Sequence, residues 1–399
     1  MTDRQNQSQA SQAASTAHDI PVDPARSSVE GRPLSRDLLS LFPQLTLYPE
    51  LAAKIEAAFR TEARRLDVVF TDVDNTLVPG TGLPEAEMRR GMEAASKLIE
   101  YISPKPIALI PITGSGWNTD TATTKSVRHR IQTGEIPSYQ HALITDGGMM
   151  ALGRDAAGNF HVDHDYQERL AQLKAHFNPE GVFEIAKWVA DRLNRGSLKG
   201  LGPINFEDVA AIDPNSPACR VYLQEHVHPL GAITDAKICF YFYANNTDER
   251  DAVERLFREE LEGYSIVCCE ERDFGNVKRA SSRPSAEVSK YCLDITPVHK
   301  GTPVEYFSKL ISDAADALQL KYGGAPLQIV TWYCGDAAND LVAARRPEVS
   351  RVVMVGGANE ELIRHQPDLA RHKKVYLETS PSRVGAASIH RALAADSLF

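Results

Sequence analysis

Two aspartates separated by one residue follow a short apolar segment of the sequence. Residues 66–71 read LDVVFT, and Asp72 and Asp74 come directly after them. Two carboxylates at this spacing can converge on one hard cation, or they can divide into a nucleophile and a general acid/base. Asn75 and Thr76 can hydrogen-bond the turn and hold that geometry. A solvated loop of turn-forming residues would have the same composition, so the interpretation depends on further sites in the chain.

Two later positions are suited to holding anionic oxygens. Thr113 ends the apolar segment 107–113 and is followed by Gly114, so its hydroxyl and the adjacent backbone N–H can hold such an oxygen. Lys300 precedes residues 301–305, whose pattern GTPVE is typical of a capped helix start. The free N–H groups and the dipole of a helix N-terminus favour phosphate, and Lys300 would add a positive charge there.

A second acidic group follows the segment 328–334, which reads QIVTWYC. It consists of Asp336, Asn339 and Asp340 in the stretch GDAAND. Carboxylate and amide oxygens are the ligands that Mg²⁺ prefers, so these residues could hold such an ion. The alternative is an aspartate that caps the following helix, with exposed polar neighbours.

Short apolar segments alternate with helical patterns through much of the chain. Strands are predicted at 66–71, 107–113, 142–145, 328–334 and 352–355. Helices are predicted between several of them, at 84–101, 302–318 and 339–345. This alternation predicts an α/β fold with a Rossmann-like parallel sheet covered on both faces. Because ligands bind at the carboxyl ends of such strands, the candidate residues would meet at one edge of the sheet.

The middle of the chain has a different pattern. It predicts helices at about 165–177 and 182–193, a strand at 237–244, a helix at 248–261 and a strand at 264–270. These elements indicate an α+β unit inserted into the parallel domain. We therefore expect a disordered tail at 1–35, a first core part at 36–160, an α+β cap at 161–290 and a second core part at 291–399. The tail has too few apolar residues to offset its ordering entropy.

In this order, the four groups of residues resemble the four motifs of the haloacid dehalogenase (HAD) superfamily. The motifs are Asp72-x-Asp74-x-Thr76, Thr113-Gly114, Lys300-Gly301 and Gly335-Asp336-x-x-Asn339-Asp340. The long interval between the second and third motifs resembles the Cof-type branch, which has a large α+β cap there and includes sucrose-phosphate phosphatases. The resemblance implies a HAD fold with an inserted cap that selects the substrate.

The resemblance also implies a role for each residue. Asp72 would attack phosphorus and form an aspartyl-phosphate, while Asp74 would protonate the leaving alcohol and then activate water. The implied Mg²⁺ ligands or supports are Asp72, Asp74 through its backbone carbonyl, Asp336, Asn339 and Asp340. The implied phosphate-binding residues are Thr113, Gly114 and Lys300. An acid/base at Asp74 favours phosphomonoester hydrolysis, because it can protonate an alkoxide leaving group.

The second motif departs from the Cof-type pattern. Proteins of that branch commonly have Thr-Gly-Arg, whereas Ser115 follows Gly114 here. This change leaves the core mechanism intact but weakens any inference about substrate or local charge. The predicted substrate is a small phosphorylated metabolite, a sugar or glycosyl phosphate. The alternatives are a phosphosugar mutase and a catalytically silent HAD-fold binding protein.

The composition is that of a soluble, acidic protein. The 399 residues include 44 Lys and Arg against 53 Asp and Glu, for a formal net charge of −9. This balance argues against nucleic acid and membranes as partners, because neutralising phosphates needs surplus basic residues. The 6 cysteines form no CxxC pair, and the N-terminal residues have no apolar signal core. We expect a cytoplasmic protein that binds a small phosphorylated substrate, with a homodimer left open.

Overall fold

The computed structural model describes two groups of elements, and in the sequence the smaller group lies between two parts of the larger one. The described residues are 36–80, 83–118, 125–137, 141–155, 157–175, 181, 184–185, 188–189, 221–224, 238–244, 247–261, 264–270, 289–379 and 384–396. The predicted tail at 1–35 and most of the predicted helix at 182–193 lie outside these residues.

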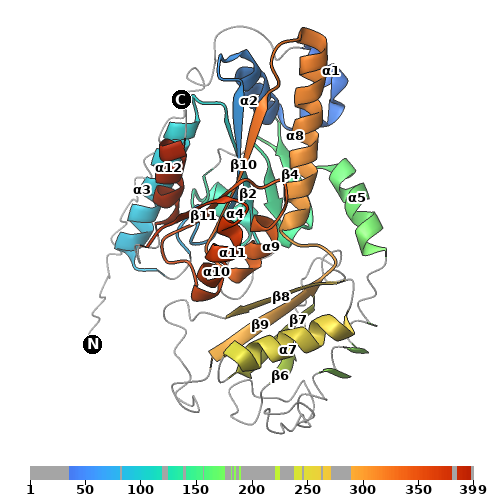
Figure 1. Cartoon of the computed structure of the whole chain (residues 1–399), viewed down its shortest axis with the longest axis vertical. Helices are drawn as coiled ribbons and strands as arrows, with labels where there is room; N and C mark the ends of the chain where they lie inside the picture. The colour runs from blue at the N-terminus through green and yellow to red at the C-terminus, as the bar shows by residue number, and fades with distance from the viewer. Residues whose placement is uncertain are drawn as a thin grey trace, which may run out of the picture.

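The larger group is built on an eight-stranded sheet (Figure 1). Its strands, in spatial order, are β12 (Lys374–Leu377), β11 (Arg351–Met354), β10 (Gln328–Gly335), β1 (Arg65–Asp72), β2 (Ile107–Ile112), β3 (Leu143–Thr145), β4 (Met150–Arg154) and β5 (Phe160–Val162). The strands from β12 to β3 are parallel, and β4 and β5 extend the sheet in antiparallel pairing. The predicted α/β class with a mostly parallel sheet is confirmed.

The central strand β1 is buried on both faces, as its β-branched and apolar residues require. Leu66, Val68 and Phe70 belong to the apolar core on one side, whereas Val69 belongs to the core on the other. The first core is covered by α1 (Arg36–Leu41), the 3₁₀ helix η1 (Pro43–Leu47), α2 (Pro49–Arg60) and α8 (Gly301–Tyr322). The second is covered by α3 (Glu85–Ile102) and α12 (Gly385–Asp396), which lie together in Figure 1.

Shorter helices fill the connections of this sheet. They are α4 (Val127–Gln132), η2 (Asp146–Gly148), α5 (His164–Lys174), η4 (Ala338–Asp340), α9 (Leu341–Ala344), α10 (Glu360–Arg364) and α11 (Gln366–Ala370). The predicted helix at 339–345 is therefore divided between η4 and α9. Helix α5 packs on the larger group, because Tyr166 donates a hydrogen bond to the Gly148 carbonyl at 2.5 Å.

Among the described residues, the smaller group consists of a four-stranded antiparallel sheet and the helix that follows its second strand in the sequence. Its strands, in spatial order, are β6 (Val221–Gln224), β7 (Ile238–Ala244), β9 (Ser289–Thr296) and β8 (Ser265–Glu270), and its helix is α7 (Thr247–Glu260). The predicted strands at 237–244 and 264–270 and the helix between them are confirmed. Strand β9 crosses the boundary expected at residue 290 and lies in this sheet. The limits of the cap stay a prediction.

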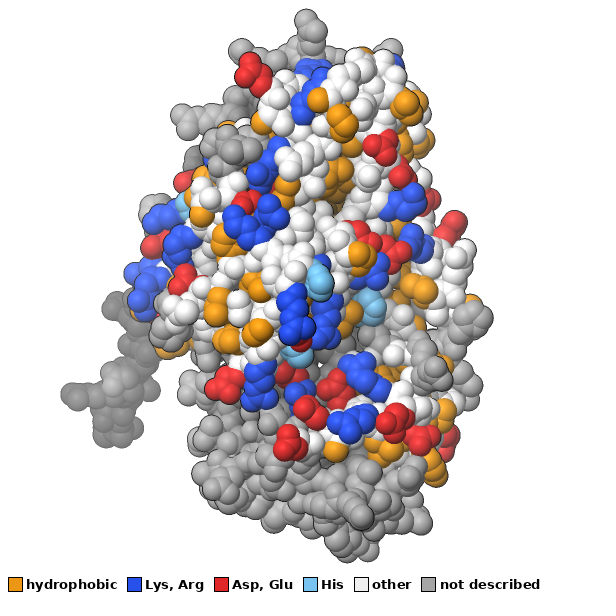
Figure 2. All heavy atoms as spheres, in the orientation of Figure 1, with side chains coloured by type: hydrophobic (Ala, Val, Ile, Leu, Met, Phe, Trp, Pro, Cys, Tyr) orange, Lys and Arg blue, Asp and Glu red, His pale blue; other side chains and the backbone are white. Residues whose placement is uncertain are grey.

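The two groups contact one another at the lower edge of the larger sheet in Figure 1. Strand β8 lies against η4, and Arg250 of α7 forms an ion pair with Glu361 of α10. Figure 2 shows Lys and Arg side chains interspersed with Asp and Glu over the described part of this face. Within the described residues, every helix is too short or too polar to cross a membrane.

Candidate active site

Three neighbouring strands bring the candidate residues to one edge of the sheet. Strand β1 pairs with β2 on one side and with β10 on the other, so that Asp72 is opposite Ile112 and Thr71 is opposite Cys334. Asp336 therefore follows β10 at the same edge at which Asp72 ends β1. The carboxyl ends of these parallel strands meet there, as the sequence predicted.

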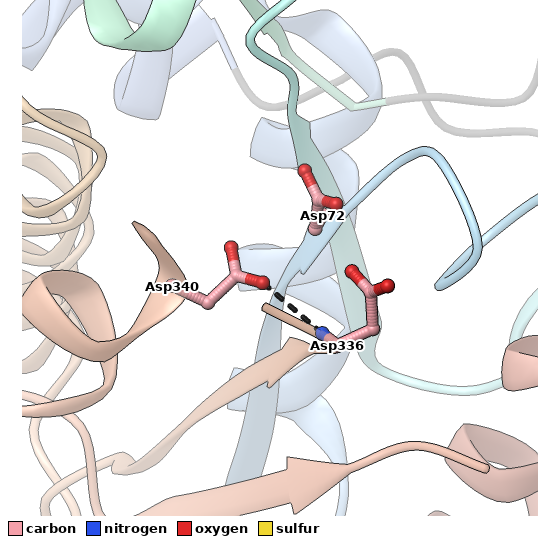
Figure 3. A group of neighbouring side chains, drawn as sticks. All are labelled: Asp72, Asp336 and Asp340. Carbon is pink, nitrogen blue, oxygen red and sulfur yellow. Dashed lines mark hydrogen bonds between the residues drawn. The ribbon is translucent and has the colours of Figure 1, made fainter. Parts of the chain in front are cut away.

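Three carboxylates meet at this edge (Figure 3). Asp72, Asp336 and Asp340 are all buried, and one carboxylate oxygen from each lies within 4.8 Å of the other two. They come from the end of β1, the residue after β10 and the helical turn η4. The sequence placed all three residues in the site, and the structure brings them together.

Lys300 lies between two of these carboxylates. Its Nζ donates to Asp72 Oδ1 at 2.6 Å and to Asp340 Oδ1 at 2.7 Å, and its side chain is buried. Burial alone would lower the pKa of Lys300, but Asp340 and Asp72 more than offset this, so its pKa lies above the usual range. Lys300 is therefore a fixed positive charge shared by two acids.

The start of α8 differs in one detail from the sequence prediction. The helix begins at Gly301 with Lys300 as its N-cap residue, and Lys300 makes no side-chain capping bond. The GTPVE pattern predicts Thr302 as the N-cap with Glu305 turned back toward it, but the helix already begins at Gly301 and Glu305 accepts hydrogen bonds from Arg169 and Arg346. Lys300 is thus free of a capping role and directs its ammonium group to the carboxylates.

Asp340 is held by hydrogen bonds to both of its carboxylate oxygens. Besides Lys300, its Oδ1 accepts from Tyr333 OH at 2.8 Å, while its Oδ2 accepts from the backbone N–H groups of Asp336 at 3.0 Å and Ala337 at 3.1 Å. A side chain at Gly335 would clash with this arrangement, since a Cβ there would lie 2.4 Å from Asp340 Oδ2. The glycine of the GDAAND stretch is explained by this close approach.

The site has more negative than positive charge, and a bound cation would balance the difference. Three carboxylates against one ammonium group give an excess of two negative charges. Burial raises the pKa of Asp72, Lys300 opposes that shift, and Asp340 and Asp336 add to it, so the pKa lies well above the usual range. A buried set of oxygen ligands with this excess fits a hard divalent cation. Asn339 adds a buried side-chain oxygen that has no hydrogen bond with the described residues.

Asp74 lies apart from the three clustered carboxylates. Its Oδ1 accepts a hydrogen bond from Arg130 Nη2 at 2.7 Å, and its side chain is 32% exposed. Of the two residues expected to hold the turn around it, Asn75 does so, because it adopts a φ of 60° and its Oδ1 accepts from the Gly80 N–H at 3.2 Å. The hydroxyl of Thr76 is buried without a hydrogen bond among the described residues.

Arg130 is a residue that the sequence reasoning missed. It lies in α4, between the second motif and β3, and is 1% exposed. The sequence around it, VRHRIQ, has three basic residues in six and would serve equally well as a solvated helix. A single sequence does not indicate which of these basic residues is buried.

The second motif lies beside Asp72, and Thr113 forms hydrogen bonds both to the neighbouring strand β3 and within its own turn. Thr113 follows β2, its N–H donates to the Ile144 carbonyl at 2.9 Å, and its Oγ1 accepts from the Ser115 N–H at 3.0 Å. Gly114 is exposed, and a Cβ there would meet no atom within 4 Å among the described residues. No described atom therefore fills the space next to this backbone.

Comparisons with known proteins concern the fold. No family model matches the sequence, and no curated protein is significantly similar to it. The structure is similar to a sucrose-phosphatase from Synechocystis in complex with sucrose and phosphate, with 18% identity and a TM-score of 0.46 over 83% of this chain and 98% of that chain. A haloacid dehalogenase-like hydrolase from Bacillus subtilis matches with 14% identity and a TM-score of 0.38 over 84% and 98%.

A third similar structure is the C-terminal domain of a trehalose-6-phosphate phosphatase from C. albicans. It matches with 12% identity and a TM-score of 0.40 over 87% of this chain and 97% of that chain. The matches include the haloacid dehalogenase-like class that the motifs predicted. At these identities the similarity concerns the arrangement of elements, and the function is inferred from the side chains of this chain.

Proposed function

We propose that this protein is a Mg²⁺-dependent phosphatase that hydrolyses phosphate monoesters through an aspartyl-phosphate on Asp72. The observation that carries the proposal is the bridge from Lys300 to Asp72 and Asp340, next to a third buried carboxylate. A dianionic phosphate repels an attacking carboxylate, and Lys300 together with a bound cation would supply the positive charge that reduces the repulsion.

Catalysis is divided between two aspartates. Asp72 attacks phosphorus, the bond to the ester oxygen breaks, and the departing alkoxide receives a proton from Asp74. In the second step Asp74 removes a proton from water, the resulting hydroxide attacks phosphorus, and phosphate leaves as the Asp72 carboxylate is restored. The partial exposure of Asp74 supports this role, because an acid/base must reach both the leaving group and water.

The cation would be held by Asp72 and Asp336, with Asp340 and Asn339 supporting them. When bound, Mg²⁺ supplies charge neutralisation to the phosphoryl group and favours the ionised form of Asp72. Thr113, Gly114 and Lys300 would bind the phosphoryl oxygens. The exposure of Gly114 and the ammonium group of Lys300 support this assignment.

The proposed substrate is a small phosphorylated metabolite, most readily a sugar or glycosyl phosphate. The motif resemblance to the Cof-type branch supports the sugar class. The packing of β8 against η4, the turn that carries Asp340, supports small size, because it places the second sheet next to the site. This unit would close over the substrate and exclude water.

The test is phosphate release from a panel of sugar phosphates and p-nitrophenyl phosphate. Each reaction is run with Mg²⁺, with a chelator and with the variant Asp72→Asn. The control is Asp313→Asn, which changes an exposed aspartate on α8. We expect turnover that requires Mg²⁺, disappears in Asp72→Asn and is unchanged in Asp313→Asn. Turnover that survives in Asp72→Asn would contradict the proposal. An isomeric product without phosphate release would identify a mutase, and ligand binding without turnover a silent binding protein.

A further inference from the structure

A buried arginine contacts Asp74, the proposed acid/base. Arg130 is 1% exposed, and its Nη2 lies 2.7 Å from Asp74 Oδ1. A guanidinium group does not lose its proton in a protein, and burying it is unfavourable unless an anion pairs with it. Asp74 accepts the one hydrogen bond that the Arg130 side chain makes with the described residues.

The other contacts of this guanidinium are weaker. Glu135 Oε2 lies 3.5 Å from its Nε, outside hydrogen-bond geometry, and that carboxylate side chain is 43% exposed. The Nε and Nη1 atoms are buried without a hydrogen bond among the described residues. Among the described residues, Asp74 is therefore the closer of the two carboxylates that compensate the buried charge, and the direction of its carboxylate is coupled to Arg130.

The backbone of α4 fixes the position of Arg130. Its N–H donates to the Ser126 carbonyl at 3.0 Å, and its own carbonyl accepts from the Ile136 N–H at 3.1 Å. Ser126 also caps α4 through its side chain. The arginine thus projects from an anchored turn, whereas Asp74 lies in the loop after β1 and is partly exposed. Of the two partners, Arg130 is the fixed one.

We propose that Arg130 is a positioning residue that orients the Asp74 carboxylate for proton transfer. This inference rests on the proposed function and extends it to a residue outside the four motifs. Arg130 acts through Asp74 and does not touch the phosphoryl group. Its contribution therefore falls on the proton transfers, at the departing alkoxide and at the attacking water, and not on the attack by Asp72.

The leaving group separates these steps. p-Nitrophenolate departs without a proton, whereas the alkoxide of a sugar phosphate needs one. In Arg130→Met we expect kcat for the best sugar phosphate of the panel to fall by about 100-fold or more, in the range of general acid–base effects. With p-nitrophenyl phosphate the same variant should release a rapid burst of nitrophenolate, up to one per active site, followed by slow turnover. The burst reports retained attack by Asp72, and the slow phase reports impaired water activation.

Three further variants complete the test, and Arg130→Lys keeps it decisive if Arg130→Met folds poorly. Arg130→Lys keeps one charged donor and should recover about tenfold of the lost kcat, since lysine replaces only part of a guanidinium contact. Arg128→Met removes an exposed arginine from the same helix and should leave kcat within about twofold of the original value. In the double variant Asp74→Asn with Arg130→Met, kcat should equal that of Asp74→Asn alone, because both changes act on one group.

The inference is overturned if Arg130→Met lowers burst and turnover in parallel, or leaves both unchanged. It is also overturned if the loss from Arg130→Met persists in full when Asp74 is already Asn. Turnover by the original chain distinguishes these results from failure of the proposed function. If the original chain hydrolyses neither ester, the proposed function and this inference fail together.

Discussion

Lys300 Nζ lies 2.6 Å from Asp72 Oδ1, although the two residues are separated by 228 positions in the sequence. The same ammonium group lies 2.7 Å from Asp340 Oδ1. One buried cation therefore holds two carboxylates close together that would otherwise repel one another. Asp72, the proposed nucleophile, and Asp340 are thus joined by one residue at the start of α8.

Replacing Lys300 should separate catalysis from cation binding. In Lys300→Met we expect kcat/KM for phosphate release to fall by about 100- to 1,000-fold, because the proposed charged donor to the phosphoryl group is lost. Mg²⁺ should still bind, since the three carboxylates remain and their excess negative charge increases. Isothermal titration of Mg²⁺ alongside phosphate release measures both effects.

The matched control for that change is Lys309→Met, which removes an exposed lysine from the same helix. Its kcat/KM and Mg²⁺ affinity should match those of the original chain. Loss of Mg²⁺ binding in Lys300→Met would show that the lysine serves to hold the carboxylates in place and not to bind phosphate.

A single methyl group at Gly335 should displace Asp340. In Gly335→Ala the added Cβ would lie 2.4 Å from Asp340 Oδ2, closer than such atoms approach in proteins. Because two backbone N–H groups and Tyr333 hold that carboxylate, it cannot simply rotate away. We expect Mg²⁺ affinity to fall by about tenfold to 100-fold, as for loss of an outer-shell support. Unchanged Mg²⁺ affinity together with an unchanged thermal midpoint would contradict the predicted clash.

The sequence was a good guide wherever a chemical group follows an apolar strand. The segments that became β1, β2 and β10 are short, apolar and buried, so their carboxyl ends and the residues after them could be located without a structure. Strands β4, β5, β6, β9 and β12 were missed. Strands β5 and β12 are only half-buried or exposed, so they lack the continuous apolar pattern that indicates a central strand.

The site was less predictable where partners come from irregular segments. Arg130 and Asp74 meet across 56 positions, and only the packing of α4 brings the arginine inward. Tyr333 was assigned to a strand by its neighbours, but a strand pattern does not indicate that its hydroxyl reaches Asp340. Such contacts depend on how loops and short helices pack, and a single sequence does not indicate that packing.

Stability should depend on a carboxylate far from the site. Asp396 of α12 accepts hydrogen bonds from Lys374, Tyr376 and Arg351. Burial raises its pKa, but these donors outweigh that effect and hold the pKa below the usual range. Its contribution to the free energy of unfolding is therefore complete above the ordinary aspartate pKa of about 3.9 and is lost as pH falls toward the folded-state pKa.

Asp396→Asn should lower the free energy of unfolding by about 2 kcal/mol at pH 7, as expected for lost charge-assisted hydrogen bonds. The difference from the original chain should stay constant down to about pH 5 and shrink below about pH 4. Urea unfolding across this range provides the measurement. Asp368→Asn, at an exposed ion pair on α11, should change stability by less than about 0.5 kcal/mol. A difference that grows on acidification would refute the assignment.

The ion pair between Arg250 and Glu361 should couple the smaller sheet to the larger group. Both side chains are largely buried, with 8% and 14% exposure. Burial raises the pKa of Glu361, and Arg250 opposes that shift. A double-mutant cycle of Arg250→Met and Glu361→Gln should give a coupling free energy of about 1 kcal/mol or more. The exposed pair Lys309 and Asp313 should give about 0.3–0.5 kcal/mol. Equal coupling free energies in the two cycles would show that the ion pair between the groups stabilises the protein no more than an exposed ion pair does.

The pairing of β1 with β10 has a consequence for how the protein is made. Arg65 is paired with Gln328, and the whole smaller sheet lies between these strands in the sequence. At about 5–20 residues per second, a ribosome needs roughly 10–50 s to reach β10 after β1 has emerged. During that time one edge of an apolar strand is without its partner, and Asp72 is without Lys300 and Asp340. Nascent chains interrupted in this interval are therefore expected to be clients of chaperones and not partly active enzymes.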